Sequence, residues 1–387
     1  MATPRRPADH ARVAVLGGGV AGSLVVSALA RVAVPSLLVD NGSHPIDDRR
    51  WGTWLPIGTT EPAVARSWHR LEVRSGTGHL ALGLREHRYA EISGEALREA
   101  TDEAKDRSGG RRLTARVLGV VDHGDSVVVT TSTGDVVSDL VLDSTGVLPG
   151  ELQQPRAWMS FEGWEVECDL PAFDPGSMVL MDFRVPQCGG LAFVYTVPTT
   201  PARALVELTT ISASCPASPS GPSSLAMSGT LTAHLDAVVG RGRYRVVREE
   251  RGTIPLRPRA IRAASGSTLA IGAAAGLVKA STGYGWPLMR RDADAVAAQV
   301  AQSLPIIGVR RRRRHAALDE VFLRLAADDP ESLATALPLL FARNPADLVL
   351  RFLAEETSRL EELRLISSLP VGPFAAAATR VLTHDPR

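Results

Sequence analysis

The sequence predicts an α/β fold that combines a parallel sheet with glycine-rich turns, an inserted domain of β-strands and a helical C-terminal region. Two observations support this prediction. The apolar runs at residues 13–16 and 269–271 each lead directly into a turn of small residues, as in parallel strands buried on both faces. From Ala316 onward, apolar residues recur instead at helical spacing. Because 387 residues are long for one hydrophobic core, we expect two coupled domains.

The first glycine-rich turn has the spacing of a dinucleotide-binding fingerprint. Gly17 allows a tight turn after the strand, Gly19 lets a pyrophosphate approach the backbone, and Gly22 lets the next helix pack on the strand. The following strand, residues 36–39, ends in Asp40, whose carboxylate is placed to accept a hydrogen bond from a ribose 2′-hydroxyl. Strand, helix and terminal acid in this order predict binding of FAD or NAD rather than NADP.

The second glycine-rich turn is the most informative stretch of the chain. From Gly272 to Gly276 small residues leave the backbone amides bare, so that a bulky group can lie against them. After Thr282, the segment from Gly283 to Trp286 places two aromatic rings between flexible joints, as a pocket wall would. A plain tight turn into a helix is the alternative interpretation.

The elements between these two turns follow a known order. We expect a helix at residues 92–104, capped by Ser93, and then a three-stranded meander formed by 112–121, 126–131 and 136–142. The meander leads into a third small-residue turn, Asp143 to Gly146. This order matches a glutathione-reductase-like FAD-binding domain, which residues 269–300 would complete.

The rest of the chain predicts an inserted sheet and a helical end. Strand-like runs at 178–183, 191–197 and 204–210 predict a sheet over the flavin, while residues 212–228, rich in Ser, Pro and Gly, predict a surface loop or lid. The predicted division is an FAD-binding domain (1–60, 90–155 and 256–300), a β-rich substrate domain (61–89 and 156–255) and a helical region (301–387), with helices at 333–341 and 345–363.

The composition limits the classes of function. Lys plus Arg and Asp plus Glu are balanced at 43 and 42, so nothing indicates nucleic-acid binding, and no metal site is predicted. No apolar run approaches the ~20 residues that span a bilayer. Cys168, Cys188 and Cys215 form no CxxC pair, and we expect reduced thiols in a cytoplasmic protein. Residues 1–11 are expected to be a disordered leader.

A run of five arginines, Arg310–Arg314, has two interpretations. It is either a solvated helix face or a site that binds anionic lipid by electrostatic attraction. In the second case each basic residue can add about 1 kcal/mol to the free energy of binding.

Three acidic residues are candidates for catalysis. Glu207 lies in an otherwise apolar and β-branched strand, and if both faces of that strand are covered, desolvation would raise its pKa and keep it protonated, as a general acid requires. The alternative is an exposed strand glutamate. Asp182 and Glu250 are further candidates, whose alternative roles are an ion pair with Arg184 and the capping of a turn.

Taken together, the motifs resemble the FAD-dependent lycopene cyclase family over nearly the whole chain, and most closely its bacterial β-cyclase-like branch. The resemblance is carried by the N-terminal fingerprint and by an ordered set of further motifs: Arg49–Trp54, Asp143–Gly146, Met181–Arg184, Phe193–Pro198, Ala204–Thr209, Glu250–Pro255, Lys279–Tyr284, Phe352-Leu353 and Ser368–Pro370.

This resemblance implies a redox-neutral cyclisation assisted by reduced FAD, with NAD(P)H as the external reductant. The glutamate aligned with Glu207 would be the general acid that protonates the terminal double bond of an acyclic carotenoid. A neighbouring double bond would capture the cation, and the ring cation would then lose a proton. Asp182 and Glu250 match acidic motifs that support the cation or accept the proton. Arg49 and the glycine-rich turns would contact the cofactor.

The sequence departs from the family at two places. Many relatives carry a second acid directly after the catalytic one, where this chain has Leu208. The turn at Gly272 lacks the Asp that many flavin hydroxylases carry there, which argues against a hydroxylase.

Other functions stay open. The alternatives are a flavin monooxygenase or prenyl reductase on the same scaffold, a cyclase of a shorter prenyl substrate, and a non-catalytic polyisoprenoid binder. Because the implied substrate dissolves in membranes, we expect a peripheral protein on the inner face of the cell membrane, docked through Arg310–Arg314 and an apolar helix such as Leu333–Phe341.

Overall fold

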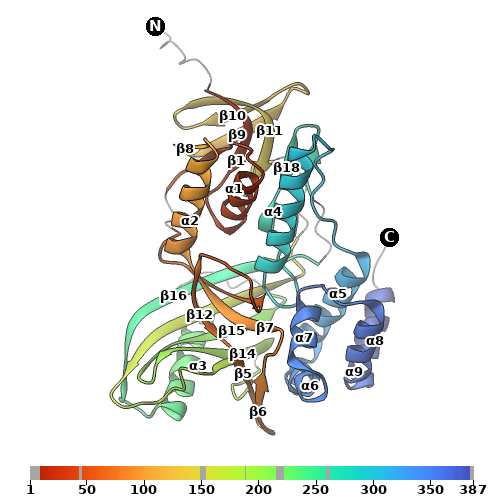
Figure 1. Ribbon diagram of the computed structural model, residues 1–387. Coiled ribbons are helices and arrows are strands. Elements are labelled where there is room, and N and C mark those ends of the chain that lie inside the picture. The colour runs from red at the N-terminus through yellow and green to blue at the C-terminus, as the bar shows by residue number, and fades with distance from the viewer. Residues whose placement is uncertain are drawn as a thin grey trace.

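The computed structural model describes residues 9–42, 46–148, 154–187, 189–214, 222–258 and 262–383. Cys188, Cys215, most of the expected leader and residues 215–221 of the expected loop lie outside these ranges. Figure 1 shows a first sheet with the helices α1, α2 and α4, a second large sheet below it, and a group of helices at the C-terminal end. Within the described ranges, no helix has both the length and the apolar character needed to cross a membrane.

The first sheet has eight strands and contains the glycine-rich turns. Its parallel core runs β18-β11-β1-β2-β8, with β17 antiparallel on β18, and β9 and β10 extend it as a meander from β11. The strands are β1 (Asp9–Leu16), β2 (Leu37–Asp40), β8 (Arg111–Thr114), β9 (Val117–Asp122), β10 (Val127–Thr131), β11 (Gly134–Asp143), β17 (Ala264–Ser265) and β18 (Thr268–Ala270).

Both faces of this sheet are buried, as the apolar run in β1 predicts. Val13 and Val15 pack toward the helices α1 (Val20–Arg31), α2 (Gly94–Arg107) and α4 (Trp286–Ala301), whereas Ala14 and Leu16 pack toward the meander. The Ser93 hydroxyl caps α2 by accepting a hydrogen bond from the Ala96 amide, which confirms the predicted cap.

The second sheet has seven strands in the order β16-β12-β15-β14-β13-β5-β6. Helix α3 (Pro222–Val238) covers one of its faces, where Val206 and Leu208 pack against Leu231 and Leu235. The other face looks toward the first domain and the C-terminal helices (Figure 1). The strands are β5 (Arg70–Ser75), β6 (Gly78–Gly83), β12 (Ala157–Cys168), β13 (Met178–Asp182), β14 (Leu191–Thr200), β15 (Arg203–Ser212) and β16 (Tyr244–Leu256).

A small third sheet lies between these two parts. It consists of β3 (Arg50–Pro56), β7 (His87–Ser93) and β4 (Val64–Trp68), paired in that order. The C-terminal helices are α5 (Arg313–Asp328), α6 (Pro330–Arg343), α7 (Ala346–Leu353), α8 (Arg359–Ser367) and α9 (Val371–Thr383). A short 3-10 turn, η1 (Gly272–Ala275), follows β18.

Two predicted elements differ from the structure. The expected strand at 112–121 is two strands, because the backbone partner changes at the junction: the Ala115 amide bonds to Asp40, and the Arg116 amide bonds to Ser132. The expected loop at 212–228 already enters α3 at Pro222, since apolar residues further along that helix pack on the sheet despite its Ser-rich start.

The C-terminal helices also depart from the prediction. The helix expected at 345–363 is divided into α7 and α8 near Glu355, which has a positive φ of 62°. Helix α9 was not predicted, because Gly372 and Pro373 at its start are residues that usually interrupt a helix. A proline within the first turn is nevertheless compatible with a helix.

The two expected membrane contacts, α6 and Arg310–Arg314, are partly occupied within the fold, although Arg310, Arg312 and Arg313 are exposed. In α6, Leu333, Leu340 and Phe341 are buried in the core, so its apolar face is not free for a membrane. Within the arginine run, Arg311 and Arg314 form ion pairs with acidic side chains of the helical region.

Candidate active site

Glu207 lies on the inner face of the second sheet. Strict alternation along β15 turns Val206 and Leu208 toward α3 and turns Glu207 to the opposite side, away from that helix. On the inner face, the neighbours of Glu207 in register are Tyr195 of β14 and Gly163 of β12. Glu207 is half-buried there, so the alternative of a solvent-facing strand glutamate does not hold.

This environment keeps the Glu207 carboxyl protonated at neutral pH. Burial, with a smaller contribution from the charge of Glu250, raises the pKa of Glu207 to about 8. A hydrogen bond of 3.1 Å donated by the Thr209 hydroxyl opposes the rise without cancelling it. At pH 7 the group is therefore mostly a neutral acid that is able to donate a proton.

Glu250 belongs to the same site. In β16 it pairs with Gly163, on the side of β12 opposite to Glu207. A methyl group at position 163 would lie 3.1 Å from Cγ of Glu250, so the glycine leaves room for that side chain over the sheet. Burial raises the pKa of Glu250, against the lowering effect of Arg248, whose guanidinium donates to it at 2.8 Å.

Asp182 lies elsewhere. It pairs in register with Val194, which belongs to the core under α3, and it is close enough to His234 of α3 for their charges to interact. Burial alone would raise the pKa of Asp182, but the hydrogen bonds and ion pair with Arg184, at 2.6 Å, outweigh it and hold the pKa low. The structure thus shows the ion pair that was the alternative role of Asp182 and does not bring it to Glu207.

Three tyrosines complete the site, and sequence analysis did not identify two of them. The hydroxyl of Tyr284 lies 3.2 Å from that of Tyr89 and 3.4 Å from that of Tyr195. Burial raises the pKa of each, and the charge of Glu207 adds to it, so the hydroxyls stay protonated. Gly52 on the adjacent strand β3 makes room for Tyr89, because a Cβ at position 52 would collide with the tyrosine hydroxyl. This glycine is the sequence signal that could have pointed to the tyrosine.

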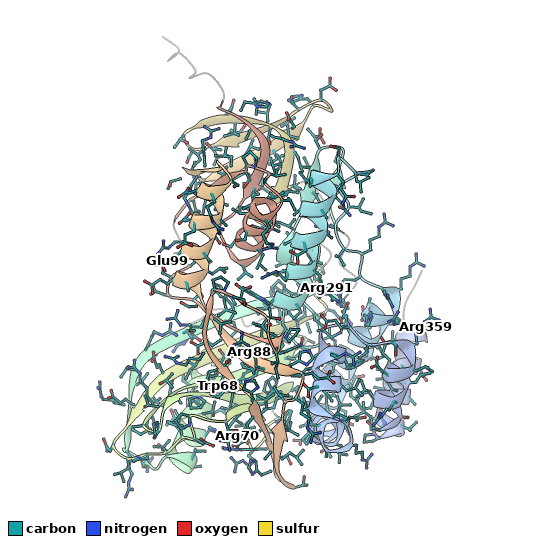
Figure 2. All side chains as sticks on the ribbon, viewed as in Figure 1. Trp68, Arg70, Arg88, Glu99, Arg291 and Arg359 are labelled. Carbon is teal, nitrogen blue, oxygen red and sulfur yellow. The ribbon has the colours of Figure 1, made fainter. Side chains whose placement is uncertain are left out.

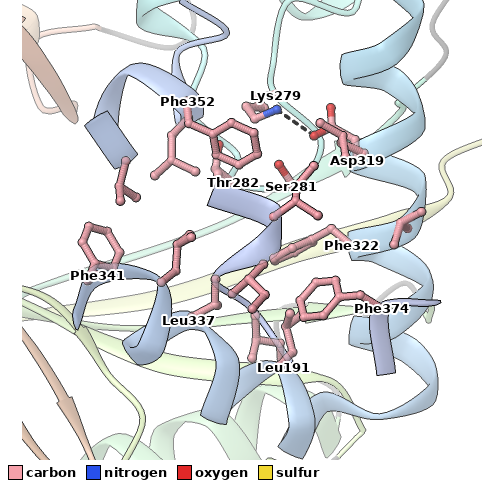
Figure 3. Close-up of a pocket in the computed structure, with 18 of the residues that line it drawn as sticks. Leu191, Lys279, Ser281, Thr282, Asp319, Phe322, Leu337, Phe341, Phe352 and Phe374 are labelled. Carbon is pink, nitrogen blue, oxygen red and sulfur yellow. Dashed lines mark hydrogen bonds and ion pairs between the residues drawn. The ribbon is translucent and has the colours of Figure 1, made fainter. Parts of the chain in front are cut away.

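An apolar cavity reaches this cluster. Its volume is about 470 Å³, and aromatic and aliphatic side chains from the inner sheet face and the C-terminal helices line it (Figure 3). Trp54, Tyr195 and Tyr284 line the cavity, with Trp54 edge-on to Tyr284 at 4.8 Å between ring centroids. Such a cavity suits a hydrocarbon ligand.

A buried group of charges flanks the cavity. The ammonium of Lys279 donates to Asp319 at 2.8 Å, as the dashed line in Figure 3 shows, and lies 3.5 Å from Glu355. Arg311 binds the same two carboxylates. All four charges are therefore compensated, and the group joins the loop after η1 to the C-terminal helices.

The first glycine-rich turn has the geometry that the fingerprint predicts. Gly17 has a φ of 95°, and a Cβ on Gly22 would collide with the Gly17 carbonyl. Gly19 begins α1 without a side-chain cap, and nothing lies within 4 Å of the place where its Cβ would be. Asp40 ends β2 beside this turn, where a Cβ on Gly18 would meet its carboxylate. An open, uncapped helix N-terminus with a carboxylate beside it fits the pyrophosphate and ribose of a dinucleotide.

The other predicted cofactor residues adopt supporting roles in the structure. A Cβ on Gly272 would lie 2.5 Å from Cβ of Ala21, so this glycine allows η1 to approach α1. Gly276 ends η1 in the left-handed conformation, and Gly146 has a φ of 79°. Asp143 is fully buried and accepts hydrogen bonds from the amides of its own turn, at 2.8 and 3.1 Å.

The remaining predicted residues lie in different surroundings, and Thr282 is the one that lines the cavity. Gly283, at a φ of 73°, packs so closely on Met159 that a Cβ would collide with its sulfur. Arg49 is exposed and lies close enough to Glu250 to lower its pKa. Trp286 is not a pocket wall as expected, because it is buried in the core of the first domain.

Trp54 lines the cavity, but its indole Nε1 is itself buried and has no hydrogen-bond partner among the described residues.

Solved structures share this architecture. A geranylgeranyl bacteriochlorophyll reductase-like protein from Thermoplasma acidophilum superposes with a TM-score of 0.67 at 13% identity, covering 97% of this chain and 100% of that one. A flavoprotein/dehydrogenase from Cytophaga hutchinsonii gives a TM-score of 0.65 at 11% identity, covering 97% and 99%. These similarities confirm the predicted α/β fold.

Similarity in sequence is more specific. The chain is 28% identical over 392 residues to the lycopene beta-cyclase of Paracoccus sp. strain N81106, and the alignment covers 94% of this chain and 95% of that protein. Residues 12–379 match the protein family described as lycopene cyclase protein. The match extends over nearly the whole chain, and the chain therefore belongs to the lycopene cyclase family.

Proposed function

We propose that the protein is an FAD-dependent lycopene β-cyclase that closes the linear end groups of lycopene into β-ionone-type rings without net oxidation or reduction. The observation that carries this proposal is Glu207, whose pKa of about 8 keeps it neutral and whose register neighbour Tyr195 lines the apolar cavity. The family match and the Paracoccus relative support the substrate.

Glu207 is the proton donor in this proposal. Its carboxyl proton adds to the terminal double bond, a neighbouring double bond closes the ring on the resulting cation, and loss of a ring proton forms the new double bond. The elemental composition is unchanged. The faces of Trp54, Tyr195 and Tyr284 offer the cation π-electron density at each stage. Glu250, the second carboxyl on this face, is the candidate to take the last proton or to stabilise the cation.

The first domain would hold FAD through its glycine-rich turns. The N-terminus of α1 at Gly19 would bind the pyrophosphate, and Asp40 would bind the adenosine ribose. Reduced FAD, when bound, supplies a negative charge near the substrate cation. NAD(P)H is proposed as the external reductant that keeps the flavin reduced.

A prenyl reductase is the second candidate, because the Thermoplasma relative in fold is a reductase-like protein. Such an enzyme would consume NAD(P)H in proportion to product, whereas a cyclase needs reductant only to prime the flavin.

The decisive experiment is anaerobic turnover of lycopene in liposomes, with chemically reduced FAD and no NAD(P)H. Wild type is compared with Glu207→Gln and with a control, Glu249→Gln, which alters an exposed carboxylate on β16, separated from β15 by β12. We expect cyclised product of unchanged mass from wild type and control alone. Product from Glu207→Gln would remove Glu207 as the acid, and product only when NAD(P)H is consumed would favour the reductase.

A further inference from the structure

The helical end of the cavity lies at the protein surface. Leu363 and Ile366 of α8 and Val371 of α9 line the cavity, and yet 62% and 73% of the surface of Leu363 and Val371 is exposed. Side chains that belong both to a cavity wall and to the outer surface mark its mouth. The apolar lining therefore continues onto the outside of the molecule between α8 and α9.

Helix α8 presents an apolar stripe at this mouth. Glu362 and Leu365 form its buried side, whereas Leu360, one turn before Leu363, is 79% exposed. The leucines on the outer side of α8 therefore form an apolar face in addition to the side that carries Glu362 and Leu365. Folding of the described chain occupies only one of them, so the outer face is available to a partner.

In the ranges that the structure covers, the charges without a partner around this stripe are basic, whereas the one partly exposed acid of α8, Glu361, is paired with Arg351 at 2.9 Å. Arg359 and Arg364 of α8 are exposed and have no acidic partner within the described part of the chain; Figure 2 shows Arg359 at the outer edge of the helical region. Arg314 of α5 binds Glu362 at 2.8 Å, which brings the start of α5 to α8. Arg310 and Arg313 are exposed at that start, likewise without an acidic partner among the described residues.

We propose that the outer face of α8 and the start of α9, with this basic rim, docks on an anionic lipid bilayer and forms the entrance through which a hydrocarbon passes into the cavity. This proposal rests on the proposed function for the identity of the hydrocarbon. Exposed leucines would enter the interfacial layer, the arginines would meet anionic headgroups, and the apolar route to Tyr284 would be continuous. A soluble protein partner would not account for a contact surface that leads into an apolar cavity.

Flotation with lipid vesicles tests the docking directly. Full-length protein is mixed with vesicles of phosphatidylcholine alone or with phosphatidylglycerol added. The test variant carries Leu360→Gln, Arg359→Gln and Arg364→Gln, none of which lines the cavity. The control carries Leu118→Gln and Val121→Gln, two comparably exposed apolar side chains on β9 of the first domain.

We expect wild type and control to float with anionic vesicles, and the test variant to partition at least about tenfold more weakly. Cyclisation of detergent-dispersed lycopene by the test variant should equal wild type, whereas cyclisation of vesicle-borne lycopene should fall. Equal flotation of test variant and wild type, or no flotation of wild type, would overturn the docking surface. If the protein floats specifically with anionic vesicles but cyclises lycopene neither in detergent nor in vesicles, the docking surface is supported and the proposed function is rejected.

Discussion

Glu207 and Glu250 approach each other across Gly163, the one residue of β12 that lies in register between them. The absence of a side chain at position 163 is what leaves the Glu250 carboxyl space above the sheet. A neighbouring carboxylate favours the protonated state of a carboxyl group, and here the charge of Glu250 raises the pKa of Glu207. The pKa of Glu207 therefore depends on the strand register that places Glu250 on the other side of Gly163.

Filling the space at position 163 should move the pH dependence of turnover. Because the active form of Glu207 is protonated, the rate should fall as the pH rises through about 8. In Gly163→Ala the new methyl would lie 3.1 Å from Glu250 and 3.2 Å from Leu205, so both side chains would have to shift slightly. A shift of Glu250 away from Glu207 should weaken its effect on the pKa of Glu207 and move this alkaline limb to lower pH. Glu250→Gln should shift it in the same direction. Gly119→Ala, with no atom near the added methyl, is the control; an unmoved limb in both test variants would contradict the coupling.

The burial of Glu207 should cost stability at high pH. Its pKa is about 8 in the folded state and 4.5 when solvated, so between these values the folded state binds more protons than the unfolded state. The contribution of Glu207 to wild-type stability should therefore decrease as the pH rises from about 4.5 to 8. Glu207→Gln should escape this loss and become more stable than wild type by on the order of 3 kcal/mol at pH 8. Thermal unfolding of both proteins across this pH range measures the difference, and a difference that does not change with pH would refute it.

Two glycines of the first turn should fail in different ways. In Gly22→Ala the methyl would meet the Gly17 carbonyl, so the apoprotein should lose roughly 1–3 kcal/mol of stability. Gly19 has open space and a φ of −75°, so Gly19→Ala should leave the apoprotein within about 1 kcal/mol of wild type. It should nevertheless weaken FAD binding at least about tenfold, or about 1.4 kcal/mol. Thermal unfolding and flavin titration separate the two effects, and unimpaired FAD binding by Gly19→Ala would place the pyrophosphate elsewhere.

The Tyr284 ring and its hydroxyl should contribute differently. Tyr284→Phe removes the links to Tyr89 and Tyr195 but keeps the ring beside Trp54, whereas Tyr284→Leu removes both. If the ring stabilises a cation, worth about 0.5–2 kcal/mol, the leucine variant should turn over lycopene several-fold more slowly than the phenylalanine variant. Equal loss of turnover in both variants would show that the contribution of Tyr284 comes from its hydroxyl, linked to Tyr89 and Tyr195, and not from its ring.

The features that sequence analysis predicted are mostly local. The fingerprint turn, the Ser93 cap and the buried strand β1 each depend on a few adjacent residues. Glu207 was identified because a carboxylate stands out in an apolar strand. This signal does not depend on which strands pair with β15.

The features that were missed depend on residues far apart in the chain. Tyr89 and Tyr284 are 195 positions apart, and only the pairing of β7 with β3 and the course of the loop before α4 bring them together. The role of Arg311 was equally hidden, because its partner Glu355 lies in the loop between α7 and α8, 44 positions away. A run of arginines predicts an exposed surface as long as the acidic residues that pair with it are not known.

The alternation of β15 has a consequence for the residue that follows the acid. Leu208 is only 2% exposed and packs under α3, on the opposite side of the sheet from the cavity. Relatives with a second acid at this place would hold it a full sheet thickness away from the substrate if their strands pair as here. Leu208 of this chain therefore contributes to the packing of α3 on the sheet, and an acid in its place would face that helix and not the cavity.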